Sequence, residues 1–263
     1  MSVMNGVSNV DGVQPLEHMQ AVAVGYINGA RSIYNFGYNI VGTTELPIIN
    51  GATSAYQYPV AATVMQVSST STTDTSTGTG ARTLFITGLN SAYNVVDETV
   101  TLSGQNQVAT VNSYVRINDS NIESAGSSET NNGTIFIGQG TATAGVVNEW
   151  YARLASGDGR SLSAVYTVPA QFRGVLVYLA MTSARTTATG FVTWRLMTRQ
   201  PGGPFIASNK LDTEAAGGSA EITYAYSPLV FASGTDIELR ALGSEAGNAC
   251  SGHFSINLLP VLE

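Results

Sequence analysis

TGARTLFITGLNSAYNVVDETVTL, residues 79–102, is the stretch that decides the fold class. Residues 82–87 are rich in β-branched and apolar side chains, Gly88 ends that run, and residues 89–94, which include Asn90, Ser91 and Asn94, turn the chain. In residues 95–102 one face carries Val96, Glu98, Val100 and Leu102, and these alternate with Val95, Asp97, Thr99 and Thr101. A period of two bounded by Gly and Asn is typical of strands, so the stretch predicts a β-hairpin.

Short apolar or alternating runs continue on both sides of this hairpin. They are separated by turn residues such as Gly202, Pro201 and Pro204, and they occupy residues 61–67, 107–117, 134–137, 147–154, 161–168, 172–181, 189–199, 205–211, 220–226, 236–242 and 251–259. Many short strands at regular spacing favour an all-β fold. The patch at residues 17–26 is too short for its period to distinguish a helix from a strand.

Breaks in composition divide the chain into four predicted parts. Residues 1–54 form an extended N-terminal arm, and residues 55–138 form a first antiparallel β-sandwich, Ig-like in its short strands. The small residues GQGTATAG at 138–145 indicate a linker over 139–146. Residues 147–263 then form a second, jelly-roll-like β-sandwich.

The predicted arm carries aromatic side chains without enough neighbours to form its own core. Tyr34, Phe36 and Tyr38 alternate with small or polar residues, and Tyr56 and Tyr58 repeat the pattern just after the arm. Ordering such a segment costs roughly 1–2 kcal/mol per residue in backbone entropy. We therefore expect these five aromatics to dock on a neighbouring subunit. A disordered tail and an arm packed on its own domain are the alternatives.

The composition argues for a protein that lives in an assembly. Charged residues make up 11% of the chain, against about 25% in an average soluble domain, and Ser, Thr, Gly and Asn replace them. The net charge is −7 and Lys210 is the one lysine, which argues against nucleic acid and anionic membranes as partners. Cys250 has no second cysteine to pair with, which is compatible with assembly in a reducing cytoplasm. The N-terminus lacks the pattern of a signal peptide.

Residues that could carry catalysis do not form a recognisable pattern. The two histidines are His18, in the predicted arm, and His253, and no G-x-S-x-G motif marks a serine nucleophile. Cys250 lies too close to His253 along one strand for a dyad, and a buried structural thiol is expected. Asp97 and Glu98 are adjacent in a strand and point to opposite faces. The sequence therefore predicts no catalytic site and no cofactor.

Ligand sites are weakly indicated. Asp119, Glu123 and Glu129 fall in one polar stretch but lack the spacing of a calcium loop, so no metal site is predicted. Trp150 and Trp194 could together form a platform for stacking sugars, although aromatic residues on sandwich strands more often belong to the core.

Several motifs, in order, resemble a group of tailed-bacteriophage virion structural proteins found in phages of aquatic bacteria. They are NFGYN at 35–39, TGTGARTLFITGLNSAYNVVDETVTLSG at 77–104, VNSYVRIN at 111–118, SAGSSETNNGTIFIG at 124–138, ASGDGRSLSAVYTVP at 155–169 and RLMTRQPGGPF at 195–205. The resemblance covers most of residues 31–210 and is weaker beyond them.

This resemblance implies a non-enzymatic virion component that assembles in the host cytoplasm. We expect a symmetric homo-oligomer, with a trimer favoured, whose partners are copies of itself and the major capsid protein or other virion subunits. The expected place is the capsid exterior, as a decoration or cement protein. A neck or tail appendage, or a fibre-associated carbohydrate-binding adhesin, is the alternative.

Overall fold

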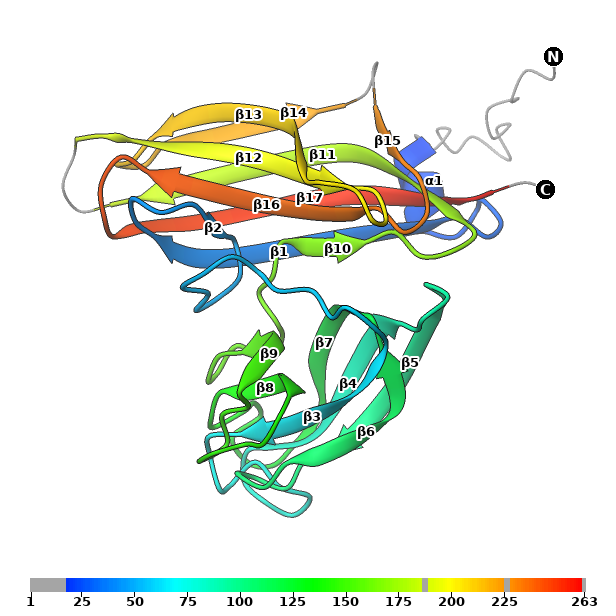
Figure 1. Cartoon of the computed structure of the whole chain (residues 1–263), viewed down its shortest axis with the longest axis vertical. Coiled ribbons are helices and arrows are strands. Elements are labelled where there is room, and N and C mark those ends of the chain that lie inside the picture. Colours follow the sequence, from blue (N-terminus) through cyan, green and yellow to red (C-terminus); the bar gives the residue numbers. More distant parts are fainter. Residues whose placement is uncertain (1–17, 186–188, 225–227, 262–263) are drawn as a thin grey trace, which may run out of the picture.

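The structure is a computed structural model that describes residues 18–185, 189–224 and 228–261 (Figure 1). Over these ranges a single short helix, α1 (His18–Ala23), precedes seventeen strands, and every strand pair is antiparallel. The predicted all-β fold class is confirmed. The helix also answers the question that the period of residues 17–26 left open.

The strands fall into two groups that lie one above the other in Figure 1. The first, here called the terminal unit, contains both ends of the described chain: β1 (Arg31–Val41), β2 (Leu46–Pro47), β10 (Val165–Thr167), β11 (Phe172–Ala184), β12 (Phe191–Arg199), β13 (Ile206–Glu214), β14 (Ser219–Thr223), β15 (Leu229–Phe231), β16 (Asp236–Gly243) and β17 (Asn248–Pro260). The second, the inserted unit, contains β3 (Thr63–Ser69), β4 (Ala81–Leu89), β5 (Val95–Thr101), β6 (Val108–Tyr114), β7 (Arg116–Ala125), β8 (Ile135–Gln139) and β9 (Glu149–Leu154).

Each unit has two sheets around one hydrophobic core. In the terminal unit the strand orders are β1-β17-β11-β14, with β15 also on β11, and β10-β16-β12-β13, with β2 also on β16. Trp194, Phe254 and Leu239 are among the buried side chains that both sheets contribute to its core. In the inserted unit the orders are β6-β3-β8-β9 and β5-β4-β7, around a core that includes Met65 and Leu84.

The hairpin predicted at residues 79–102 is confirmed. β4 and β5 pair from Thr83↔Thr101 to Leu89↔Val95. The turn is closed by Asn90, whose Oδ1 accepts hydrogen bonds from the backbone N–H groups of Ala92 and Asn94. Alternation also holds, because Val100 and Leu102 are buried on the core side. The alternation in the sequence matches the alternation of buried and exposed side chains, because one face of this sheet packs on the core and the other does not.

Residues 31–47 do not form the arm that the sequence predicted. β1 pairs with β17 over its whole length, from Arg31↔Leu258 to Val41↔Asn248, and β2 pairs with β16. The chain just after β2 also packs closely against β1. Gly37 permits this contact, because a Cβ there would lie 2.0 Å from the backbone oxygen of Ile48. The segment that lacks a core of its own therefore shares the core of a unit built mainly from the other end of the chain. Residues 1–17 of the predicted arm lie outside the described residues.

Residues 139–146 are also placed differently from the prediction, which made them a domain linker. They connect β8 to β9, which pair directly from Ile135↔Leu154 to Gln139↔Glu149 in one sheet. The chain instead passes between the units at residues 48–62 and 155–164 (Figure 1). A run of small residues suits a tight connection between strands as well as a linker, so composition could not distinguish the two.

Candidate functional site: the buried contact between the two units and the outer aromatic face

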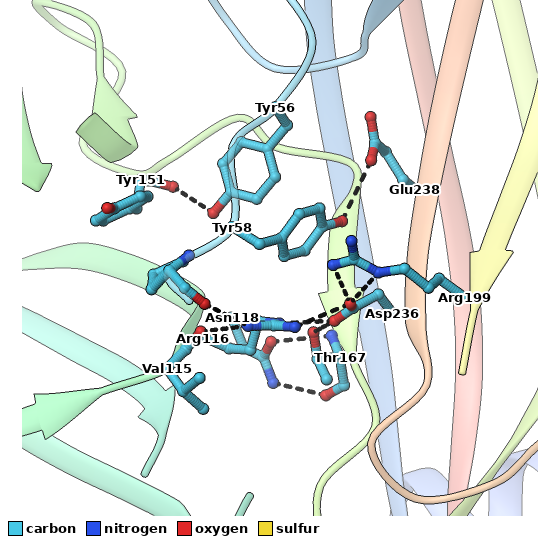
Figure 2. Close-up of polar contacts among 11 residues, drawn as sticks. Tyr56, Tyr58, Val115, Arg116, Asn118, Tyr151, Thr167, Arg199, Asp236 and Glu238 are labelled. Carbon is cyan, nitrogen blue, oxygen red and sulfur yellow. Dashed lines mark hydrogen bonds and ion pairs between the residues drawn. The ribbon is translucent and has the colours of Figure 1, made fainter. Parts of the chain in front are cut away.

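Asp236 lies at the centre of the contact between the units (Figure 2). Its side chain is 1% exposed. Arg116, on β7 of the inserted unit, donates from Nε to Oδ1 at 2.7 Å and from Nη2 to Oδ2 at 3.0 Å. Arg199, on β12, donates to Oδ2 from Nε at 2.9 Å and Nη2 at 2.6 Å, and Thr167 Oγ1 donates to Oδ1 at 2.6 Å. One buried carboxylate thus binds arginines from both units.

Tyr58 packs into this ionic cluster from the segment that joins the units (Figure 2). Its ring lies between two guanidinium groups, with its centroid 4.7 Å from Arg116 Cζ and 4.4 Å from Arg199 Cζ. Its hydroxyl donates to Glu238 Oε2 at 3.2 Å. Burial, reinforced by the Glu238 carboxylate, raises the pKa of Tyr58 well above its usual value, so the phenol stays a neutral donor.

Glu238 extends the cluster along β16. It is fully buried and accepts hydrogen bonds from Arg240 Nε at 2.9 Å and Nη2 at 3.2 Å. Burial raises the pKa of Glu238, while the hydrogen bonds and charge of Arg240 oppose that rise. Glu45 forms ion pairs with Arg195 and Arg240 beside it. Such charges are costly to bury unless they are paired, and here each has partners.

Uncharged hydrogen bonds join the units on either side of the cluster. Asn118, on β7, donates from Nδ2 to the carbonyl of Thr167 at 2.9 Å and accepts from its backbone N–H at 3.0 Å (Figure 2). Tyr56 donates its hydroxyl hydrogen to the carbonyl of Tyr151 at 2.9 Å. The acceptors here are occupied by protein donors, and the arrangement acts as a clamp that holds the two units in one orientation.

A second feature lies on the outer side of the sheet β1-β17-β11-β14. Inward positions of β1, such as Asn35 and Val41, are buried, so the alternating positions Tyr34, Phe36 and Tyr38 point outward. Tyr34 is 52% exposed. Its ring lies 4.9 Å from His253 on β17, measured between centroids, and His253 lies 5.2 Å from the ring of Tyr178 on β11. These five residues, here called the outer aromatic face, span three neighbouring strands.

The outer aromatic face has charged neighbours on one side, where Asp158 and Arg160 line a cavity with Tyr34 and Phe36. Its neighbours on β17 and β11 are small, such as Ser251, Ser255 and Ala180. Burial lowers the pKa of His253, and the nearby carboxylate of Glu221 on β14 partly opposes this shift. The imidazole is therefore neutral near neutral pH. Tyr34 is exposed and the other four rings are partly buried, and a surface on which aromatic rings gather in this way has the composition of a protein contact surface.

The five aromatic residues predicted to dock together are divided by the structure. Tyr34, Phe36 and Tyr38 share the outer aromatic face, on a strand instead of a free arm. Tyr56 and Tyr58 lie in the contact between the units, where their rings meet edge to face at 4.6 Å. Docking on a neighbouring subunit was expected of all five, but Tyr56 and Tyr58 bind residues of the same chain, Tyr151 and Glu238.

The two tryptophans are likewise apart. Trp194 is fully buried in the core of the terminal unit, and its Nε1 donates to Thr213 Oγ1 at 3.0 Å. It is therefore not part of an open sugar platform, and that half of the prediction is wrong. Trp150 is partly exposed at the start of β9, with its ring 6.4 Å from Phe136.

The other residues considered for catalysis are held by contacts within the protein. Cys250 points into the core and burial raises the pKa of its thiol to about 12, whereas His253 points outward from the same strand. Glu98 accepts hydrogen bonds from the Tyr114 hydroxyl at 2.7 Å and from the backbone N–H groups of Val111 and Asn112. Among the described residues no three His, Cys, Asp or Glu side chains converge as metal ligands. Nor does any helix in those ranges have the length and apolar character needed to span a membrane.

Sequence reasoning missed the ionic clamp. One signal was present: in DIELRAL, residues 236–242, the charged residues Asp236, Glu238 and Arg240 alternate with apolar ones. That alternation predicts a polar strand face, which is normally solvated. Nothing in the strand itself shows that a second unit covers this face.

Comparisons with known proteins leave the family open. No family model matches the chain, and no curated protein matches it. Among solved structures, the crystal structure of the infectious bursal disease virus VP2 subviral particle matches with 11% identity and a TM-score of 0.25, covering 87% of this chain and 71% of that one. The structure of infectious bursal disease virus Gx strain matches with 12% identity and a TM-score of 0.26 over the same shares. These scores are too low for the likeness to carry an argument.

Proposed function

We propose that this chain is a non-enzymatic structural protein of a bacteriophage virion, which decorates or cements the capsid exterior as a symmetric homo-oligomer. The ordered motifs that resemble phage virion proteins and the charge-poor composition support this. In this proposal the two units are antiparallel β-sandwiches, the terminal one jelly-roll-like. The ionic clamp suits such a role, because it fixes the orientation of the units without leaving reactive groups free.

The observation that carries the proposal is the outer aromatic face. Tyr34, Phe36 and Tyr38 lie on a strand that is held along its length by β17, so their positions are already ordered before binding. Docking them therefore avoids most of the entropy cost that a free arm would incur. The proposed occupant of this face is the major capsid protein.

Attachment to particles tests the proposal. Purified chain is mixed with phage capsids that lack it, and bound protein is quantified after sedimentation. We expect the triple variant Tyr34→Ser, Phe36→Ser, Tyr38→Ser to lose most attachment. The matched control is Phe191→Ser with Ile206→Ser, because both residues are exposed apolar side chains on the other sheet of the same unit. Equal attachment by the triple variant and the wild type would overturn the proposal, and binding to tails in place of heads would move the site to the neck or tail.

The oligomeric state is tested separately by light scattering. The proposed trimer has three times the mass of one chain, and a monomer at all concentrations would contradict it. The triple variant should keep the oligomer while losing attachment, because the outer aromatic face is assigned to the capsid and not to another copy.

A further inference from the structure

A cavity of about 220 Å³ opens beside Trp150. One wall is the irregular segment 51–57, which follows β2, and the other is the chain that enters β9. The residues that line it include Thr53, Ser54, Gln57, Asn148, Glu149 and Trp150. Pockets for drug-sized ligands are about 300–1,000 Å³, so this cavity suits a smaller ligand, of the size of one sugar ring.

Trp150 provides a fixed aromatic surface in this cavity. Its ring packs against a small buried cluster of Ile49, Ala52 and Val165, and it stays partly exposed on the cavity side. An indole held in this way needs little reordering to bind a ligand. The C–H face of a pyranose ring is apolar and flat, and it matches an aromatic ring better than a flexible aliphatic side chain does.

Uncharged polar groups surround the indole. None of the hydrogen bonds formed within the described residues uses the side chains of Thr53, Ser54 or Asn148. Gln57 donates from Nε2 to the carbonyl of Ala55 at 3.1 Å, which leaves its Oε1 as an acceptor. Hydroxyl and amide groups both donate and accept, as sugar hydroxyls do.

The charge of the lining bears on whether a neutral or an acidic sugar fits the cavity. Glu149 is the charged residue among the lining residues, and the guanidinium of Arg153, which is not one of them, packs against Gly51 and donates to the carbonyl of Asn50. A carboxylate repels phosphates and acidic sugars but accepts hydrogen bonds from hydroxyl groups. The lining therefore favours a neutral sugar.

Contacts between the walls keep the cavity open. The hydroxyl of Tyr56 donates to the carbonyl of Tyr151, and Arg153 Nη1 donates to the carbonyl of Asn50 at 2.9 Å. The first contact joins segment 51–57 to β9, and the second joins β9 to Asn50, the residue just before that segment. The cavity is thus built by the same meeting of the units that forms the ionic clamp.

We propose that this cavity, with Trp150 as its stacking surface and Gln57 and Asn148 as hydrogen-bonding partners, is a binding site for a neutral monosaccharide unit. The site goes beyond the proposed structural role and does not depend on where the chain sits in the virion. It would give a virion protein contact with a polysaccharide surface.

Intrinsic fluorescence is a selective probe, because the chain has two tryptophans and Trp194 is fully buried. The whole chain is titrated with the methyl glycosides of glucose, galactose, mannose and N-acetylglucosamine, and binding is measured in parallel by saturation-transfer NMR. We expect a saturable emission change with at least one of them and none with sialic acid. No saturable binding of any neutral glycoside would overturn the proposal.

Variants then locate the site. Trp150→Ala should weaken binding at least tenfold by NMR, whereas Trp150→Phe should retain part of it. Gln57→Ala with Asn148→Ala, both at exposed residues, provides a second test if Trp150→Ala folds poorly, as judged by Trp194 emission. Tyr34→Ala is the control and should bind as the wild type does. Unchanged binding in both the tryptophan and the double variant would place the sugar elsewhere, and neither result bears on capsid attachment.

Discussion

Asp236 shows how much one buried side chain can determine. It receives hydrogen bonds from Arg116 in one unit and Arg199 in the other, so its charge holds together parts of the chain that are 120 positions apart. Burying such a group is favourable only while all partners remain, and loss of one partner leaves the others as unpaired charges.

Asp236→Asn should therefore lower the free energy of unfolding by about 3–5 kcal/mol, since two arginines lose their counter-charge in a buried site. Urea unfolding measures the change. The matched control is Asp119→Asn, which removes a similar Asp–Arg pair with Arg160 whose side chains are 36% and 44% exposed. Exposed pairs contribute about 0–1 kcal/mol, so the control should change stability little. Similar losses in both variants would show that the clamp is not specially stabilising.

Glu238 predicts a pH dependence of stability. Because burial raises its pKa in the folded state, the folded protein holds the proton more tightly than the unfolded chain. The resulting stabilisation is fully present below the ordinary pKa of a glutamate and is lost as the pH rises through the raised folded value.

Comparison with Glu238→Gln isolates this group. The free energy of unfolding of the wild type minus that of the variant should become larger as the pH is lowered from neutral toward the ordinary glutamate range, because the variant does not titrate there. Denaturant unfolding at several pH values provides the measurement. A difference that shrinks on acidification would mean that Arg240 dominates and that the folded pKa is lowered.

Among the elements, β1 differs most from the prediction, because the sequence predicted a free arm and the structure has a paired strand. Its alternation of aromatic and small residues is that of an extended chain, and the structure places the aromatic positions on the outward side of the sheet. Its backbone hydrogen bonds, however, go to β17, more than two hundred positions later in the chain. Local pattern specifies the strand but not its partner.

Gly37→Ala tests whether β1 is a strand of the terminal unit. A methyl group there meets backbone atoms of Ile48 and Ala164, which cannot move aside cheaply. We expect a loss of about 1–3 kcal/mol in unfolding free energy by thermal or urea denaturation. Ile40→Ala, on the same strand but 60% exposed, is the control and should be nearly neutral. A free arm would tolerate both substitutions equally.

At the scale of the whole molecule, the inserted unit interrupts the terminal unit. Its core residues all come from the span from Met65 to Leu154, whereas the core of the terminal unit combines Val41, Leu46 and Ile48 with residues from Ala164 onward. The inserted unit is continuous in sequence and the terminal unit is not. The inserted unit should therefore fold without the rest of the chain, whereas the terminal unit needs both of its segments.

Residues 60–157 alone should therefore fold, with a cooperative thermal transition and dispersed NMR signals, because they contain a complete core. The chain from which residues 1–50 are removed should instead lose the terminal unit, since the edge of β17 and part of its core become exposed. Circular dichroism and limited proteolysis of both fragments check this. A well-folded terminal unit in the second fragment would contradict the role given to β1.

What the sequence by itself determined is local: the all-β class, the hairpin at 79–102 and the extended backbone around Tyr34, Phe36 and Tyr38. These follow from period and turn chemistry, which depend on neighbouring residues. Only the tertiary structure decided that β1 pairs with β17, that Trp194 is enclosed while Trp150 lines a cavity, and that Asp236 is buried. Each of these depends on contacts between distant segments, and the alternating pattern of a strand is the same whether water or another sheet covers its polar face.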